Sequence, residues 1–139
     1  MPVADTELIF ALNPNDKKHS AALEALTIKG LKVPDTALLE FQTVLRARGR
    51  KASEVASAVE SLSYILKRSG VKEAHTLNTV LIIKQAEIEE KYGLTYFDSL
   101  IAASTLKLDG VVVSDDADFD RVPGLTRIPI TPETRESNK

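Results

Sequence analysis

Residues 96–103 read YFDSLIAA, and residues 111–119 read VVVSDDADF. In the first stretch a single carboxylate, Asp98, opens an apolar helix that we expect to end at residues 109–110. The second stretch is a short run of β-branched residues, typical of a buried strand, and it stops in an acidic loop. Helix, buried strand and acidic loop in this order are typical of an open α/β sheet, whose binding sites lie at the carboxyl ends of the strands. We therefore expect a functional site at the end of this strand.

The composition sets limits on the class of protein. The chain has 139 residues, which suits one domain with one core, and its 18 basic and 20 acidic residues nearly cancel. The absence of cysteine excludes disulfides, thiolate nucleophiles and cysteine-ligated zinc. The sequence shows neither the features of a signal peptide nor an apolar run long enough to cross a membrane. We expect a cytoplasmic protein with one domain over residues 1–131 and a polar, flexible tail over residues 132–139.

The rest of the chain alternates between strands and helices at both ends, with further helices between. We expect other short strands at residues 2–4, 31–33 and 125–128. We expect helices at residues 8–12, from Asp16 to near Gly30, from Asp35 to Gly49, from Ser53 to Ser69, and from Leu77 to Gly93 after a polar connection. This order predicts an α/β protein with three layers, α/β/α, around a central and mostly parallel sheet.

Five acidic residues follow the predicted strands closely enough to meet at one edge of this sheet. They are Asp5 after the first strand, Glu40 in the helix after the second, Asp98 at the start of the helix before the late strand, and Asp116 and Asp118 after that strand. Carboxylates crowded together repel one another, and a hard divalent cation would relieve the repulsion. Oxygen ligands without histidine or cysteine favour Mg²⁺ or Mn²⁺ over zinc.

Each of these residues also has a purely structural interpretation. Thr95 and Asp98 are spaced as in a capping box, and Asp5 could cap the helix that follows it. Glu40 could be a solvated helix residue, and Asp116 could belong to a turn, as could Asp118. The prediction of a site therefore rests on the joint arrangement of the acids.

Several segments carry a resemblance to a known family. They read ADT at residues 4–6, LEF at 39–41, LTYFDSLIA at 94–102, SDDADF at 114–119 and RVPGL at 121–125. Together they resemble the PIN-domain nucleases, most closely the toxin nucleases of the VapBC type. The resemblance extends from residue 5 to about residue 128, and the late segments are more specific than the first two.

The resemblance implies a metal-dependent ribonuclease that hydrolyses phosphodiester bonds in RNA with Mg²⁺ or Mn²⁺. It also implies a homodimer and, for a toxin, an antitoxin protein as partner. Carried over by position, Asp5, Glu40, Asp98 and Asp116 are the catalytic and metal-binding acids, Asp118 is a further metal ligand, and Thr6 and Ser114 support the site, with Ser114 in place of a threonine that orients a carboxylate. The sequence does not decide between one cation and two, nor which RNA is cut.

Two features near these acids have more than one interpretation. Glu7 stands where many family members have asparagine or serine, and it could alter the number of cations, repel RNA or point away from the site. Arg46, Arg48, Arg50 and Lys51 form a basic cluster at the end of the helix that carries Glu40. These arginines could contact RNA phosphates, or they could simply complement the carboxyl end of the helix.

Other functions share parts of this pattern. An RNA-processing nuclease without an antitoxin would look the same in sequence, as would a catalytically silent module of this fold that binds RNA or protein. Retention of the four main acids argues against the silent module. A phosphoacceptor receiver domain would need an acidic pair after the first strand and a lysine after the last, which residues 5–7 and 125–128 do not clearly supply.

Overall fold

The computed structural model of the protein describes residues 1–131, and the predicted tail at 132–139 lies outside this range. Its elements follow the chain in this order: β1 (Val3–Ala4), α1 (Thr6–Phe10), α2 (His19–Ala25), β2 (Lys32–Pro34), α3 (Asp35–Ala47), α4 (Ala52–Arg68), β3 (Lys72–Ala74), α5 (Thr79–Tyr92), α6 (Tyr96–Leu108), β4 (Val111–Val113), the 3₁₀ helix η1 (Ala117–Arg121) and β5 (Thr126–Ile128).

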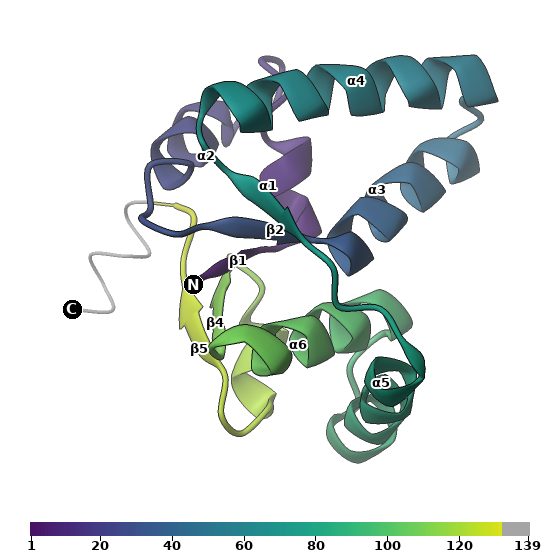
Figure 1. The fold of residues 1–139 in the computed structure, drawn as a ribbon, viewed down its shortest axis with the longest axis vertical. Coiled ribbons are helices and arrows are strands. Elements are labelled where there is room, and N and C mark those ends of the chain that lie inside the picture. The colour runs from purple at the N-terminus through teal and green to yellow at the C-terminus, as the bar shows by residue number, and fades with distance from the viewer. Residues whose placement is uncertain (132–139) are drawn as a thin grey trace.

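The strands form one sheet in the order β3-β2-β1-β4-β5, and every pairing between the described strands is parallel. In Figure 1, α2 and α4 lie on one side of the sheet, and α5 and α6 lie on the other. The predicted α/β/α fold with a central parallel sheet is therefore confirmed. Because all strands point the same way, their carboxyl ends share one edge of the sheet.

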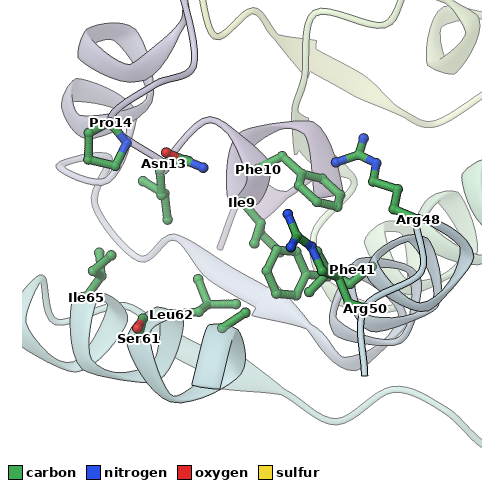
Figure 2. Close-up of a pocket in the computed structure, with 13 residues that line it drawn as sticks. Ile9, Phe10, Asn13, Pro14, Phe41, Arg48, Arg50, Ser61, Leu62 and Ile65 are labelled. Atoms are coloured by element: carbon green, nitrogen blue, oxygen red, sulfur yellow. The ribbon is translucent and has the colours of Figure 1, made fainter. Parts of the chain in front are cut away.

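The helices α1, α3 and α4 do not close completely against one another. They leave an apolar groove of about 360 Å³, which we define by its lining residues Ile9, Phe10, Phe41, Leu62 and Ile65 with their neighbours. In Figure 2, Ile9 points towards Leu62 across this space, and the Phe10 ring lies near that of Phe41, with 4.9 Å between the ring centres.

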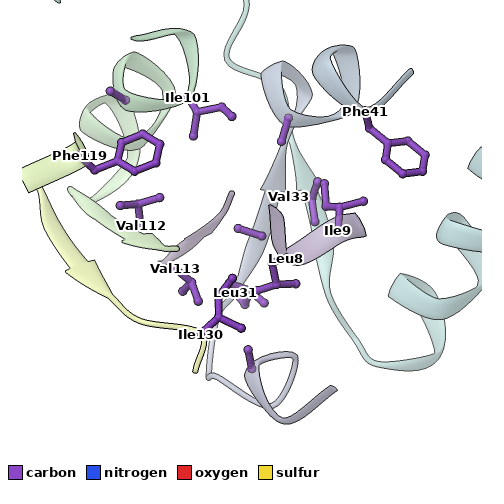
Figure 3. Packing of buried hydrophobic residues seen from close by; sticks show 14 of the residues in the cluster. Leu8, Ile9, Leu31, Val33, Phe41, Ile101, Val112, Val113, Phe119 and Ile130 are labelled. Carbon is purple, nitrogen blue, oxygen red and sulfur yellow. The ribbon is translucent and has the colours of Figure 1, made fainter. Parts of the chain in front are cut away.

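The central strands carry the core. Val3 and Ala4 in β1 and Val112 and Val113 in β4 have no exposed surface, and Val112 and Val113 lie among the packed side chains of Figure 3. The run of β-branched residues that predicted a buried strand is thus a central strand of the sheet. Gly110, just before β4, has φ of 82°, and a Cβ there would lie 2.7 Å from the Gly124 carbonyl oxygen, so the turn into this strand requires glycine.

Several local expectations were wrong, including the helix expected at residues 8–12, which is α1 at Thr6–Phe10. The polar connection before α5 contains strand β3, whose Lys72 and Glu73 are exposed because it is an edge strand of the sheet. Helix α2 begins at His19, whereas Asp16 accepts the Lys18 N–H at 2.8 Å in the preceding turn. Helix α5 begins at Thr79, with Asn78 as its N-cap.

The length and apolar character of the described helices show whether any of them could span a membrane. None of those within residues 1–131 is both long enough and apolar enough to cross a bilayer.

Candidate active site

Asp5 stands where β1 ends, next to the end of β4. Its N–H donates to the Val113 carbonyl at 3.1 Å, which extends the pairing of the two strands by one residue. One carboxylate oxygen, Oδ1, accepts the Thr6 N–H at 2.7 Å, and the other, Oδ2, accepts the Ser114 hydroxyl at 2.7 Å. The same Ser114 oxygen accepts the Asp116 N–H at 3.0 Å. Ser114 therefore links the two acids and fixes the orientation of the Asp5 carboxylate.

Two helices bring further carboxylates to the same place. Glu40 comes from the second turn of α3 and Asp98 from the first turn of α6. Both line a pocket of about 260 Å³ together with Asp5 and Asp116, and we call this the acidic pocket. Its remaining lining residues are Thr6, Glu7, Phe10, Val44 and Arg48. Four acids from separate parts of the chain are thus brought together at the carboxyl edge of the sheet.

Asp118 approaches the same cluster from η1. One carboxylate oxygen from each of Asp98, Asp116 and Asp118 lies within 4.8 Å of the other two. Asp118 also forms an ion pair of 2.8 Å with Arg121, so part of its charge is already neutralised within the protein. It is placed to add a ligand at the rim of the cluster.

Two carboxylates of the acidic pocket, those of Asp5 and Asp98, are harder to ionise than usual. Burial raises the pKa of Asp5 to about 7, and repulsion from Asp98 adds to the shift, although the bond from Ser114 opposes it. Burial likewise raises the pKa of Asp98 to about 6, and repulsion from Asp116 is the next cause. A positive charge in the pocket would stabilise both ionised forms.

The donor set fits a hard divalent cation. All the candidate ligands are oxygen atoms, which suits Mg²⁺ or Mn²⁺. Thr6, which is 4% exposed, also lines the pocket, and its hydroxyl is the one buried side-chain polar atom within residues 1–131 that lacks a hydrogen-bond partner. Buried polar atoms normally have a hydrogen-bond partner. A ligand in the pocket, or a water molecule bound to a cation there, would give the Thr6 hydroxyl the partner that it lacks.

The structural interpretations of Asp5 and Asp98 are also correct in part. Asp5 is the N-cap of α1, through its bond from the Thr6 N–H. In α6 the N-cap is Thr95, whose hydroxyl accepts the Asp98 N–H at 3.3 Å. Because the backbone of Asp98 makes this bond, capping and a place in the acidic pocket do not exclude each other.

Comparisons with known proteins give the family of this chain. Residues 3–125 match the profile of the PIN domain. The chain belongs to the PIN-domain family. The resemblance found in the sequence is thereby confirmed, whereas a search of the curated proteins finds no match.

Solved structures share the fold of this PIN domain at low sequence identity. VapC20 of Mycobacterium tuberculosis, a sarcin-ricin-loop-cleaving toxin, is 20% identical with a TM-score of 0.66, and the match covers 86% of this chain and 93% of that one. VapBC2 of Rickettsia felis, bound to a promoter DNA fragment, is 18% identical with a TM-score of 0.64, covering 92% and 97%. A toxin-antitoxin complex of Klebsiella pneumoniae is 15% identical with a TM-score of 0.63, covering 91% and 96%.

Glu7, the residue that departs from the family pattern, is held by partners beside the pocket of this PIN domain. Its Oε1 accepts the Asp115 N–H at 3.1 Å, and its Oε2 accepts Lys18 Nζ at 3.2 Å. Lys18 also reaches Asp115 Oδ2 at 2.9 Å and so bridges two acids next to the site. Sequence reasoning did not find Lys18, because a partner that lies 97 residues away leaves no local signal.

Asp115 has a different task from its neighbour Asp116. Its Oδ1 accepts the N–H groups of Ile130 at 2.7 Å and Thr131 at 3.1 Å, and its Oδ2 accepts the Thr131 hydroxyl. Burial alone would raise the pKa of Asp115, but the bonds from Thr131 and Lys18 outweigh it and lower the pKa to about 2. Asp115 therefore anchors the segment that follows β5 as a permanent anion.

The three arginines of the basic cluster have different partners in the structure. Arg46 donates to Gln42 Oε1 at 3.2 Å, and Arg50 pairs with Glu54 at 3.7 Å. Arg48 alone of the three lines the acidic pocket, with its guanidinium 5.0 Å from the centre of the Phe10 ring.

Proposed function

We propose that this PIN domain, spanning residues 1–131, is a divalent-cation-dependent endoribonuclease and the toxin of a toxin–antitoxin pair. The observation that carries the proposal is the acidic pocket, where Asp5, Glu40, Asp98 and Asp116 converge and two pKa values are raised. Membership of the PIN-domain family supports nuclease activity. One structural relative, VapC20, is a sarcin-ricin-loop-cleaving toxin, and this supports RNA as the substrate.

The residues of the acidic pocket have two roles, which are to bind the cation and to orient its ligands. Asp5, Glu40, Asp98 and Asp116 would hold the cation, and Asp118 would add a ligand from η1. Ser114 and the Thr6 N–H keep the Asp5 carboxylate in one orientation. When bound, Mg²⁺ or Mn²⁺ supplies Lewis-acid chemistry, which polarises a phosphodiester and lowers the pKa of water.

An inhibitory protein partner is the second part of the proposal. The structural relative from Klebsiella pneumoniae is a toxin-antitoxin complex, and this supports a partner of the same kind here. The apolar groove between α1, α3 and α4 is next to the acidic pocket, since Phe10 and Arg48 line both. An antitoxin segment with apolar side chains that occupied the groove (Figure 2) would bring its neighbouring residues to the acids.

The activity is tested with purified protein and single-stranded RNA. We expect slow internal cleavage with Mg²⁺ or Mn²⁺, none in excess EDTA, and none by the variant Asp116→Asn. Glu87→Gln, an exposed acid on α5, is the matched control and should cleave at the wild-type rate. Undiminished cleavage in EDTA or by Asp116→Asn would exclude this mechanism, and RNA binding without cleavage would favour the silent module.

A further inference from the structure

A second polar cavity adjoins the acidic pocket. It measures about 250 Å³, and we call it the side pocket, lined by Phe10, Asn13, Asn15, Asp16 and Arg48. Phe10 and Arg48 also line the acidic pocket, so the two cavities share a wall. A chain of nucleotides bound across the acids therefore has a place to insert the base next to the cleaved phosphodiester.

Arg48 in the shared wall is available to a ligand. Within residues 1–131 it has no carboxylate partner, unlike Arg50, and it lies exposed with its guanidinium over the Phe10 ring at 5.0 Å. A guanidinium can bind phosphate and can also offer a flat face to a nucleobase, and aromatic rings do the latter as well. A guanidinium and an aromatic ring, two groups that bind single-stranded RNA, thus lie at the boundary between the two pockets.

The other wall of the side pocket carries groups that can distinguish bases. Asn13 Oδ1 accepts the Asn15 N–H at 3.0 Å, and Asp16 Oδ1 accepts the Lys18 N–H at 2.8 Å, so the loop holds these side chains in place. In the described part of the chain, Asp16 Oδ2 and the side-chain amide of Asn15 form no hydrogen bond. A free carboxylate oxygen in a base pocket selects an edge that presents N–H donors.

From these observations we propose that the side pocket binds one guanine base of a single-stranded RNA, next to the phosphodiester in the acidic pocket. Asp16 accepts from the N1–H and the 2-amino group of guanine, Arg48 binds the adjoining phosphate, and Phe10 supports Arg48. The proposal rests on the proposed ribonuclease function and adds a base preference to it. Adenine has an acceptor at N1 and no 2-amino group, so it cannot give Asp16 this pair of hydrogen bonds.

Binding is measured first, in the Asp116→Asn background so that the RNA stays intact. The probes are fluorescent 12-nucleotide RNAs that carry guanosine, inosine or adenosine at one central position of an otherwise uridine sequence. We expect guanosine RNA to bind about tenfold more tightly than adenosine RNA, with inosine between. Adding Asp16→Asn should remove this preference.

The arginines give a matched pair of variants. Arg48→Gln should weaken binding of all three RNAs and flatten the salt dependence of binding, whereas Arg46→Gln, two residues earlier on α3, should do so much less. Melting curves show whether each variant is folded.

The possible results distinguish the side-pocket proposal from the proposed ribonuclease activity. With Asp116 intact, Mn²⁺ should produce cleavage next to the guanosine, and Asp16→Asn should spread the cuts over other positions. Cleavage without base preference, or equal losses from Arg46→Gln and Arg48→Gln, would overturn the side-pocket proposal while leaving the ribonuclease in place. Guanine preference in binding without any cleavage would support the pocket and overturn the activity. RNA binding that neither Asp16→Asn nor Arg48→Gln changes would overturn the side-pocket proposal.

Discussion

Asp5 and Asp98 each combine a place in the acidic pocket with a second task at a helix start. Asp5 caps α1 with one oxygen and accepts the Ser114 hydroxyl with the other. Asp98 gives its backbone N–H to Thr95, and its carboxylate faces the acids. Neither set of bonds removes the cost of ionising these groups, since burial and repulsion still raise both pKa values. A cation would remove that cost, and this yields two predictions.

Replacement of Asp98 separates a metal ligand from a capping residue. Asp98→Asn removes one charge from the acidic pocket at nearly constant volume, so without cation we expect the variant to be as stable as the wild type or more so. Mn²⁺ should raise the melting temperature of the wild type much more than that of the variant, because binding to the folded state stabilises by mass action. Cleavage should fall to background. Glu87→Gln should keep the full Mn²⁺ shift.

The capping interpretation makes the opposite prediction for Asp98→Asn. Loss of the favourable charge at the start of α6 would then lower stability by about 0.3–1 kcal/mol. A variant that melts lower than the wild type but retains the whole Mn²⁺ shift would remove Asp98 from the set of ligands.

The pH dependence of stability tests Asp5. The pKa of Asp5 is raised from 3.8 to about 7 in the folded protein, so its contribution is fully present below pH 3.8 and is lost as the pH rises through 7. Without cation, the free energy of unfolding should therefore fall between pH 5 and pH 8, with Asp98 contributing in the same direction. Each pKa unit corresponds to about 1.4 kcal/mol. Asp5→Asn should flatten the slope.

Urea unfolding in EDTA at three pH values within this window measures the effect. Asp115, whose pKa is lowered to about 2, acts in the opposite sense, because its contribution is lost only as the pH falls from 3.8 towards 2. The window from pH 5 to 8 therefore leaves Asp115 fully ionised. A slope that Asp5→Asn does not change would show that Asp5 is not the group responsible.

At the scale of elements, a buried network of hydroxyls joins α3 to α6. The Ser104 hydroxyl lies 2.7 Å from that of Thr36 and 2.8 Å from that of Thr76, and Asp35 holds Thr76 at 2.7 Å. Thr36, Thr76 and Ser104 are at most 1% exposed. Glu40 lies one turn after Thr36 on α3, so the same network fixes how the helix of Glu40 sits against the helix of Asp98.

We predict that Ser104→Ala weakens the cation site as well as the fold. It leaves the buried Thr36 hydroxyl without its hydrogen-bond partner, at a cost of about 1–3 kcal/mol, and loosens α3 against α6, whereas Thr76 keeps its bond to Asp35. Thr105→Val is the matched control, because the Thr105 hydroxyl is equally buried but bonds only to Ile101 of its own helix, at 2.7 Å. Urea unfolding and calorimetric Mn²⁺ titration should show both variants destabilised and only Ser104→Ala with lower affinity. Equal affinities would confine the network to stability.

The elements differ in how far the sequence alone defines them. Residues 94–103 and 111–119 predicted α6, β4 and the acidic loop, because their signals are local. Strand β3 was missed because an edge strand needs no apolar face, and Lys72 and Glu73 look like a loop. The positions of the acids after the predicted strands indicated that they would lie together in one site. Their catalytic and metal-binding roles stay predictions. The bridge from Lys18 to Asp115 and the stacking of Arg48 on Phe10 depend on tertiary contacts that no sequence spacing reveals.

At the scale of the whole molecule, α5 presents an apolar surface that residues 1–131 do not cover. Leu81 and Ile88 pack into the core, whereas Val80, Ile82 and Ile83 are 71%, 51% and 62% exposed. Contiguous exposed apolar residues of this kind mark interaction surfaces.

We predict that α5 forms the contact of a homodimer. Light scattering of the wild type at tens of micromolar, a rough working range for weak interfaces, should give twice the mass of the chain. The double variant Val80→Asp/Ile83→Asp should be monomeric with an unchanged melting temperature at low concentration, because both side chains are already in solvent in the monomer. Tyr64→Asp is the matched control on α4, where the side chain is 63% exposed. A monomeric wild type would contradict the dimer, and a dimer that Tyr64→Asp breaks and the α5 variant does not would move the contact to α4.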